Sequence, residues 1–148
     1  MSDQLPDDMR VVVGDEEVAE AGDRGLARAG ARGTAIAGDY ARAEAGDEGH
    51  AQAGILSCAL SGTRGRSLTA ERGYSRTGQA GTAITGEWGT AVAGLFGKVA
   101  AGDGGFLVLD ALDATGRRVL LIGAVGTDGI CPGVCYEAAG GGFVEVGD

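Results

Sequence analysis

The chain has 148 residues, of which 30 are glycine and two are proline, and its formal net charge at pH 7 is −9. This length requires only one domain. The sequence has neither an apolar run long enough to cross a bilayer nor a charged start followed by an apolar stretch, so we expect a cytoplasmic protein with no membrane partner.

Residues 1–13 are predicted to form an N-terminal cap. They begin with the acidic residues Asp3, Asp7 and Asp8 and end in an apolar run at residues 11–13. If the following segments stack, the first of them exposes an unpaired strand edge, which favours aggregation unless it is covered or charged. A charged, solvated terminus followed by an ordinary first strand is the alternative for residues 1–8.

Residues 14–109 consist of twelve octapeptides in unbroken phase. Glycine occupies the first position in eleven octads and the fourth position in nine, the exceptions at the fourth being Glu17, Ala41 and Ser57. The sixth position is Ala or Ser in ten octads, and the eighth is Ala, Ser or Thr in eleven. A fixed period without insertions is typical of repeat architectures.

Each octad is predicted to contain a turn and a short strand, because small residues recur every two positions, which is the period of a strand. The first-position glycine is expected to give the turn its backbone freedom. The fourth, sixth and eighth positions share one face, and the fifth and seventh, which carry residues such as Arg42 and His50, should face solvent. The sixth-position alanines should therefore be buried, namely Ala27, Ala35, Ala43, Ala51, Ala59, Ala83 and Ala91.

One octad cannot bury its own face, so the octads should wind into an all-β fold, a β-solenoid. Two octads per coil give a flat coil of sixteen residues with two sheets, whereas three give a triangular coil of twenty-four. Gly, Ala and Ser can fill a thin layer between two sheets but would leave a triangle hollow, and protein interiors do not tolerate voids. We therefore favour six coils of sixteen residues over the triangular alternative.

Residues 110–148 are predicted to form a C-terminal β-hairpin cap. Apolar segments at 106–112 and 117–125 flank a turn at 113–116, which indicates a hairpin, and a second short hairpin is expected between Cys135 and Val146. Val99, Leu107 and Leu109 are the only large residues at inward octad positions. Because they lie next to the cap, the core should widen towards it.

The octads at residues 62–69 (GTRGRSLT) and 78–85 (GQAGTAIT) resemble the octapeptide repeats of bacterial ice nucleation proteins. This resemblance covers residues 14–101 and implies a coil of two octads. The array and its ending, from residues 102–109 (GDGGFLVL) to Cys135, Tyr136 and residues 143–146 (FVEV), are similar to small β-helical proteins of phages and bacteria whose function is uncharacterised. That similarity covers residues 22–146 and implies a fold but no activity.

The distribution of charge bears on nucleic-acid partners. Residues 1–21 have a net charge of −6, residues 22–109 of +1 and residues 110–148 of −4. A phage- or mobile-element-derived inhibitor that imitates DNA needs carboxylates along the rod, but the array is close to neutral. No basic stripe with aromatic residues is present either, so we expect no nucleic-acid partner.

Ice binding, which the first resemblance raises, needs unbroken rows of outward threonines. Thr34, Thr82 and Thr90 occupy the fifth octad position, where the row is interrupted by Arg42, His50, Arg66, Tyr74 and Lys98. No seventh position carries Thr. The sequence therefore indicates a related scaffold without the threonine lattice.

The candidate ligands and catalytic groups predict no metal, no cofactor and no enzyme activity. Cys131 and Cys135 lack the usual spacing of a zinc knuckle, so reduced thiols are expected. His50 is outward-facing and has no evident nucleophile or acid as a partner. Aspartates in Gly-Asp pairs lack the period of calcium-binding nonapeptides and should stabilise turns by local Asx hydrogen bonds; they are Asp15, Asp23, Asp39, Asp47 and Asp103.

A two-octad coil gathers apolar outward residues on one face, with Arg76 as the only charge among them. These candidate interface residues are Cys58, Leu60, Tyr74, Thr90, Val92, Phe106 and Val108. In a three-octad coil the set would instead be Thr34, Ile36, Cys58, Leu60, Thr82, Ile84, Phe106 and Val108. An apolar face of a parallel sheet is seldom left in water, so a second copy or residues 110–148 should cover it.

We favour a homodimer, and hence a non-catalytic scaffold or protein-binding module that self-associates. An inhibitor that acts by surface mimicry of DNA or another ligand is the main alternative. The second alternative is a scaffold related to ice-binding proteins.

Overall fold

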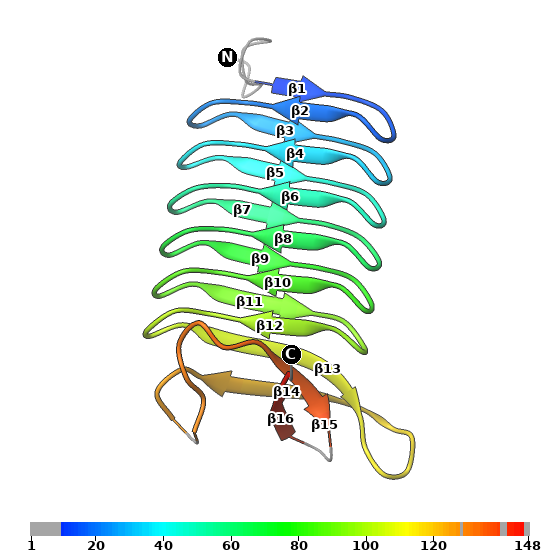
Figure 1. Cartoon of the computed structure of the whole chain (residues 1–148), viewed down its shortest axis with the longest axis vertical. Helices are drawn as coiled ribbons and strands as arrows, with labels where there is room; N and C mark the ends of the chain where they lie inside the picture. Colours follow the sequence, from blue (N-terminus) through cyan, green and yellow to red (C-terminus); the bar gives the residue numbers. More distant parts are fainter. Residues whose placement is uncertain (1–9, 128, 140–141, 147–148) are drawn as a thin grey trace, which may run out of the picture.

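The computed structural model describes residues 10–127, 129–139 and 142–146 and consists of short strands joined by turns, arranged as a β-solenoid (Figure 1). Sheet A contains β1 (Arg10–Val12), β3 (Leu26–Arg28), β5 (Arg42–Glu44), β7 (Cys58–Leu60), β9 (Tyr74–Arg76), β11 (Thr90–Ala93), β13 (Phe106–Leu112) and β14 (Arg118–Ala124). Sheet B contains β2 (Val18–Glu20), β4 (Thr34–Ile36), β6 (His50–Gln52), β8 (Arg66–Leu68), β10 (Thr82–Ile84), β12 (Lys98–Ala100), β15 (Tyr136–Ala139) and β16 (Gly142–Glu145). In the described ranges, no helix is long and apolar enough to span a membrane.

The register of the sheets confirms the sixteen-residue coil. Parallel neighbours always join residues sixteen apart, as in Thr34↔His50 and Thr82↔Lys98 in sheet B and in the corresponding pairs of sheet A. The triangular coil of twenty-four residues is thereby excluded. β1 follows the same register, with Arg10 opposite Leu26, so it is the first strand of sheet A. The rest of the predicted N-terminal cap, residues 1–9, lies outside the described residues.

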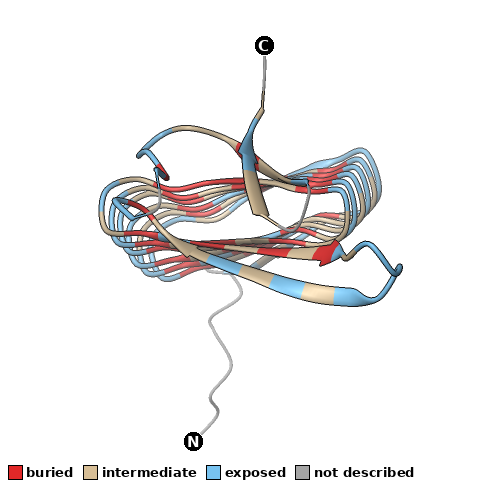
Figure 2. Cartoon of the chain, turned by 90° about the horizontal axis from the view of Figure 1, so that it is seen from below, coloured by how far each residue is buried: buried red, intermediate tan, exposed pale blue. Residues whose placement is uncertain are grey.

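The core is a thin layer between the inward faces of the two sheets, as Figure 2 shows from the end of the rod. The prediction of buried sixth-position alanines is confirmed. Ala51 is 2% exposed, and the exposed fraction is 0% for Ala27, Ala35, Ala43, Ala59, Ala83 and Ala91. The layer is so thin that serine side chains reach across it. Ser67 of β8 donates its Oγ–H to the backbone oxygen of Arg76 of β9, and Ser75 of β9 donates to that of Ile84 of β10, both at 2.7 Å.

The turns correct the role predicted for the first-position glycines. Positive φ angles of 55° to 62° occur at the third position, where eleven octads carry a residue other than glycine. The first-position glycine is needed because successive coils approach closely. A Cβ on Gly30 would lie 2.9 Å from the backbone nitrogen of Asp15, and at the fourth position a Cβ on Gly81 would lie 2.5 Å from the Cβ of Thr77. Where these contacts occur, glycine is therefore favoured for its missing side chain and not for its backbone freedom, although Ala70 occupies the first position of one octad.

The turn aspartates also act differently from the local Asx turns that were predicted. The Oδ1 atoms of Asp15, Asp23, Asp39 and Asp47 accept hydrogen bonds of 2.9–3.0 Å from backbone N–H groups sixteen residues later. Each of these carboxylates therefore joins its own turn to the equivalent turn of the next coil. Asp103 lies in the last octad, so no later octad can supply the matching donor.

The predicted C-terminal hairpins close the other end of the rod. β13 and β14 form the first hairpin, and β15 pairs antiparallel with both β12 and β16. Val99, Leu107 and Leu109 are 0% exposed. They share one core cluster with Val125, Ile130 and Tyr136 of the cap, which confirms that the core widens towards this end.

A candidate interaction face on sheet A

The outward side chains of sheet A form two rows that run along the rod. In one row Cys58, Tyr74, Thr90 and Phe106 occupy successive strands. In the other row Leu60 is followed by Arg76, Val92 and Val108. All seven candidate interface residues predicted from the sequence thus lie together on one side of the solenoid, with Arg76 in their middle.

The hairpin strand β14 lengthens both rows by one residue. Its Ala124 lies opposite Phe106 and its Ile122 lies opposite Val108. Ile122 is 66% exposed, Leu120 is 57% exposed and Phe106 is 50% exposed, whereas Leu60, Val92 and Val108 are partly buried by their neighbours. We call the seven predicted residues together with Leu120 and Ile122 the apolar face.

Sequence reasoning missed Leu120 and Ile122, although a signal was present. The segment 117–125 was predicted to be a strand, but which of its side chains face outward depends on the antiparallel register with β13. That register is fixed by the turn, where the N–H of Asp113 donates to the carbonyl oxygen of Arg117 at 2.9 Å. A reading of alternate residues outward from this turn would have placed both side chains on the apolar face.

The described part of the C-terminal cap does not cover the apolar face. The inner side of β14 packs against the cap, since a Cβ on Gly123 would lie 2.5 Å from Ile130 and 2.8 Å from Phe143. β15 and β16 continue sheet B instead, on the opposite side of the rod, as the end view in Figure 2 shows. The fold-back of residues 110–148 over this face, one of the two covers considered above, is therefore not seen in the described residues.

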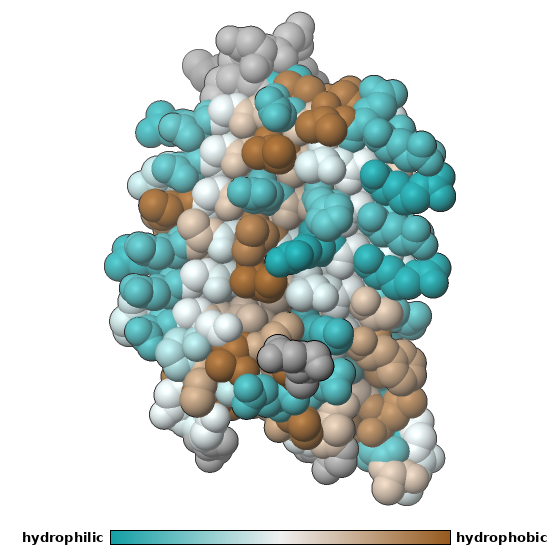
Figure 3. Space-filling model, in the orientation of Figure 1, coloured by the Kyte–Doolittle hydropathy of each residue, from teal (hydrophilic) through white to brown (hydrophobic). Residues whose placement is uncertain are grey.

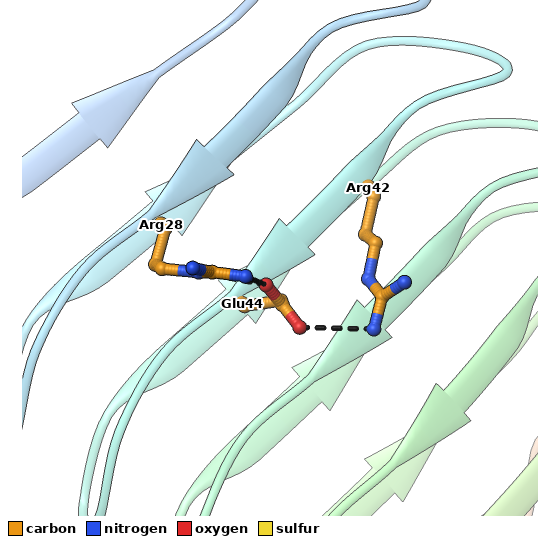
Figure 4. A network of polar contacts seen from close by, with 3 residues as sticks. All are labelled: Arg28, Arg42 and Glu44. Carbon is orange, nitrogen blue, oxygen red and sulfur yellow. Dashed lines mark hydrogen bonds and ion pairs between the residues drawn. The ribbon is translucent and has the colours of Figure 1, made fainter. Parts of the chain in front are cut away.

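Towards the N-terminus the same side of sheet A becomes charged. Glu44 accepts hydrogen bonds from Arg28 at 2.6 and 2.8 Å and from Arg42 at 2.9 Å (Figure 4). The side chain of Glu44 is only 19% exposed between the two arginines. This cluster marks the boundary of the apolar face, because Arg42 is the register neighbour of Cys58.

A groove of about 420 Å³ runs beside the apolar face. Its lining includes Leu60, Arg76 and Val92 together with Asp110 and Arg118 from the hairpin. Arg118 forms an ion pair with Asp110. Among the described residues Arg76 has no ion pair, so the groove combines apolar and polar lining residues with a net positive charge.

The outward side of sheet B is more mixed than the apolar face. One row contains Ile36, Leu68 and Ile84 but is interrupted by Gln52, and the other contains His50, Arg66 and Lys98. Figure 3, which views the rod from this side, shows hydrophobic patches alternating with hydrophilic ones. Thr34 and Thr82 lie on sheet B and Thr90 on sheet A, so the threonines considered for ice binding do not share one face.

The remaining candidate groups do not assemble into a chemical site within the described ranges. Cys58 and Cys135 are partly buried, Cys131 is exposed, and all three are free thiols. Burial raises the pKa of the Cys135 thiol, which disfavours the thiolate that a metal or an electrophile would need. No cluster of three or more His, Cys, Asp or Glu side chains arranged to hold a metal ion occurs in those ranges.

Comparisons with known proteins give no relative on which a function could be based. No protein family matches the chain. No curated protein and no solved structure matches it at a significant level.

Proposed function

We propose that this protein is a non-catalytic β-solenoid scaffold or protein-binding module that self-associates through the apolar face of sheet A. The observation that supports the proposal is the continuity of this face. Its two rows extend from β7 to Ala124 and Ile122 of β14 with Arg76 as the only charged side chain in them, and the described C-terminal strands leave it open. Exposed apolar patches of this kind are typical of interaction sites.

A second copy of the chain is the partner we favour. A two-fold axis allows one patch to serve on both subunits, and the regular coils keep this patch flat along the rod. The charged cluster of Arg28, Arg42 and Glu44 would lie at the rim of such an interface, where polar groups are usual. Catalysis forms no part of the proposal, because His50 is exposed on the outer side of sheet B and belongs to no group of three or more His, Cys, Asp or Glu in the described residues that could hold a metal ion.

The test introduces positively charged side chains into the apolar face. Leu60→Arg combined with Val92→Arg should abolish association through the apolar face and give a smaller, folded species, because each new guanidinium would have to be desolvated in the interface. The control is Leu68→Arg combined with Ile84→Arg, which adds the same two charges to neighbouring strands of sheet B. Light scattering over a range of protein concentrations measures the size. A wild-type monomer at high concentration, or a sheet A variant that keeps the wild-type size, would contradict the proposal.

The resemblance to ice nucleation repeats supports the scaffold part of this proposal, since both have coils of two octads. It does not extend to ice binding, because the threonine rows are broken. An inhibitor that imitates another molecule's surface remains the alternative function. A pull-down that recovers a single stoichiometric enzyme would favour the inhibitor, whereas self-association alone favours the scaffold.

A further inference from the structure

The backbone of β14 has one paired edge and one outer edge. At the two ends of the hairpin the N–H of Asp113 donates to the carbonyl oxygen of Arg117, and the N–H of Val125 donates to that of Gly105, both at 2.9 Å. Hydrogen-bonded pairs alternate along an antiparallel ladder. The odd-numbered residues from Arg117 to Val125 therefore direct their N–H and C=O groups towards β13. The even-numbered residues direct theirs outward, away from the solenoid.

The outer edge ends sheet A, since β14 is the last strand of that sheet. The carbonyl oxygen of Ala124 accepts from the N–H and the hydroxyl of Thr127, at 3.2 and 2.8 Å. Within the described part of the chain, no hydrogen bond reaches the outward N–H and C=O groups of Leu120 and Ile122. Two backbone N–H donors and two C=O acceptors, spaced as along a strand, are thus unpaired in the described residues at this end of the rod.

The outer edge of β14 also lacks the devices that normally protect an edge strand, which are short length, charge and proline. β14 has seven residues, and Arg118, its only charged residue, is paired with Asp110. The other edges differ. β1 and β2 have three residues each, with Arg10 at the start of β1 and Glu20 at the end of β2. β16 has four residues and ends in Glu145.

We propose that the outer edge of β14 pairs antiparallel with β14 of a second copy of this chain, about a two-fold axis. The strand is self-complementary in the register that sets Leu120 opposite Ile122 of the second copy. In that register each Leu120–Ile122 pair exchanges two N–H···O=C bonds, and the four apolar side chains gather on one side of the joined sheet. The two Arg118 side chains lie at opposite ends of the joint, so like charges do not meet.

This arrangement joins two rods by their C-terminal ends and makes sheet A continuous across the junction. The N-terminal ends, whose first 21 residues carry a net charge of −6, point away from each other and are kept from joining by repulsion. Because the joint uses backbone groups of one edge, it does not depend on the function proposed for the apolar face.

Amide hydrogen exchange of the wild-type protein, followed by NMR at high and low concentration, tests the pairing. The amides of Val119, Leu121 and Gly123 face β13 and report the hairpin itself. The amides of Leu120 and Ile122 should exchange at least about tenfold more slowly at high concentration than at low concentration. Fast exchange of these two amides at every concentration, with the inward amides protected, overturns the proposal.

Proline substitutions provide matched variants. Ile122→Pro removes an outward N–H and should end the edge pairing while the hairpin stays intact, whereas Leu121→Pro removes an inward N–H and should disrupt the hairpin itself. Ile122→Thr keeps the N–H and should retain the slow exchange of Leu120. An Ile122→Pro protein that still shows slow, concentration-dependent exchange of Leu120 overturns the pairing.

The Leu60→Arg, Val92→Arg variant separates this proposal from the proposed function. If the edge joins the copies, that variant keeps the slow exchange of Leu120 and Ile122. If the variant is monomeric and both amides exchange fast, the apolar face alone holds the copies together and the edge pairing is wrong.

Discussion

Neighbouring residues in an octad turn meet opposite steric demands. The third position has a positive φ and carries a side chain in eleven octads, whereas a Cβ at a fourth-position glycine would meet the eighth-position side chain of the preceding octad. From the sequence, glycine at the first and fourth positions was a sound indication of a turn. The sequence alone does not show why glycine is favoured there, because a glycine needed for positive φ and a glycine needed for close packing look the same in the repeat pattern.

The pair Ala80 and Gly81 separates these two demands. Ala80 has φ of 57°, so Ala80→Gly should relieve strain and raise the free energy of unfolding by up to about 1 kcal/mol. Gly81→Ala places a Cβ 2.9 Å from the carbonyl oxygen of Gly65 and should lower it by about 1–3 kcal/mol. Chemical denaturation measures both. Equal losses in the two variants would show that the third position tolerates its side chain without strain.

The first C-terminal hairpin shows how much of an element the sequence predicts. The turn at residues 113–116 and both flanking strands follow from turn residues and apolar runs, and the structure confirms them. The side-chain rows on its outer side do not follow, because they depend on a register that the turn hydrogen bonds set. The apolar face was accordingly predicted up to Val108, but not across β14.

The turn of this hairpin contains a titratable contact. The pKa of Asp113 is lowered, first by the hydrogen bond from the Thr115 hydroxyl and then by that from the backbone N–H of Arg117. Because the folded-state pKa lies below the unfolded one, the contact stabilises the turn above the unfolded value. It is lost as the pH falls through the folded value.

An NMR titration of the Asp113 carboxyl carbon checks this expectation. Its midpoint should lie below the ordinary aspartate value and should move up towards it in Thr115→Val. A midpoint that stays the same in Thr115→Val would mean that the hydroxyl does not cause the shift.

At the scale of the whole molecule, stability should depend on position along the rod, because each coil contacts only its neighbours. Ala51 of β6 lies between β4 and β8, whereas Ala19 belongs to β2, the end strand of sheet B. Both are at most 2% exposed. The sheets can separate more easily at an end than in the middle of the array.

Ala51→Leu should therefore lower the melting temperature sharply or prevent soluble expression, with a cost above the usual ~1–3 kcal/mol of overpacking. Ala19→Leu should lower the melting temperature less than Ala51→Leu does. Thermal unfolding followed by circular dichroism compares the two. An unchanged melting curve for Ala51→Leu would mean that the thin core is not as closely packed as its burial indicates.

The coil size was predictable for a reason that applies to the molecule as a whole. The small volume of the inward side chains favours the sixteen-residue coil, since Ala and Ser can fill only a narrow gap between the sheets. The serine hydrogen bonds across the core confirm that the gap is narrow. The bonds between the turns of successive coils were not predictable, because an aspartate that bonds its own turn and one that bonds the next turn occupy the same position in the repeat.

Because parallel strands pair residues sixteen apart, the length of this rod can change only by whole coils if the strand pairing is to stay the same. The loss of sixteen residues would keep the backbone register between the remaining coils. The loss of eight would exchange the two sheets, so that the hairpin of β13 and β14 would follow sheet B and β15 would meet sheet A. Variants of this rod should thus differ in length by steps of one coil, about 4.8 Å each.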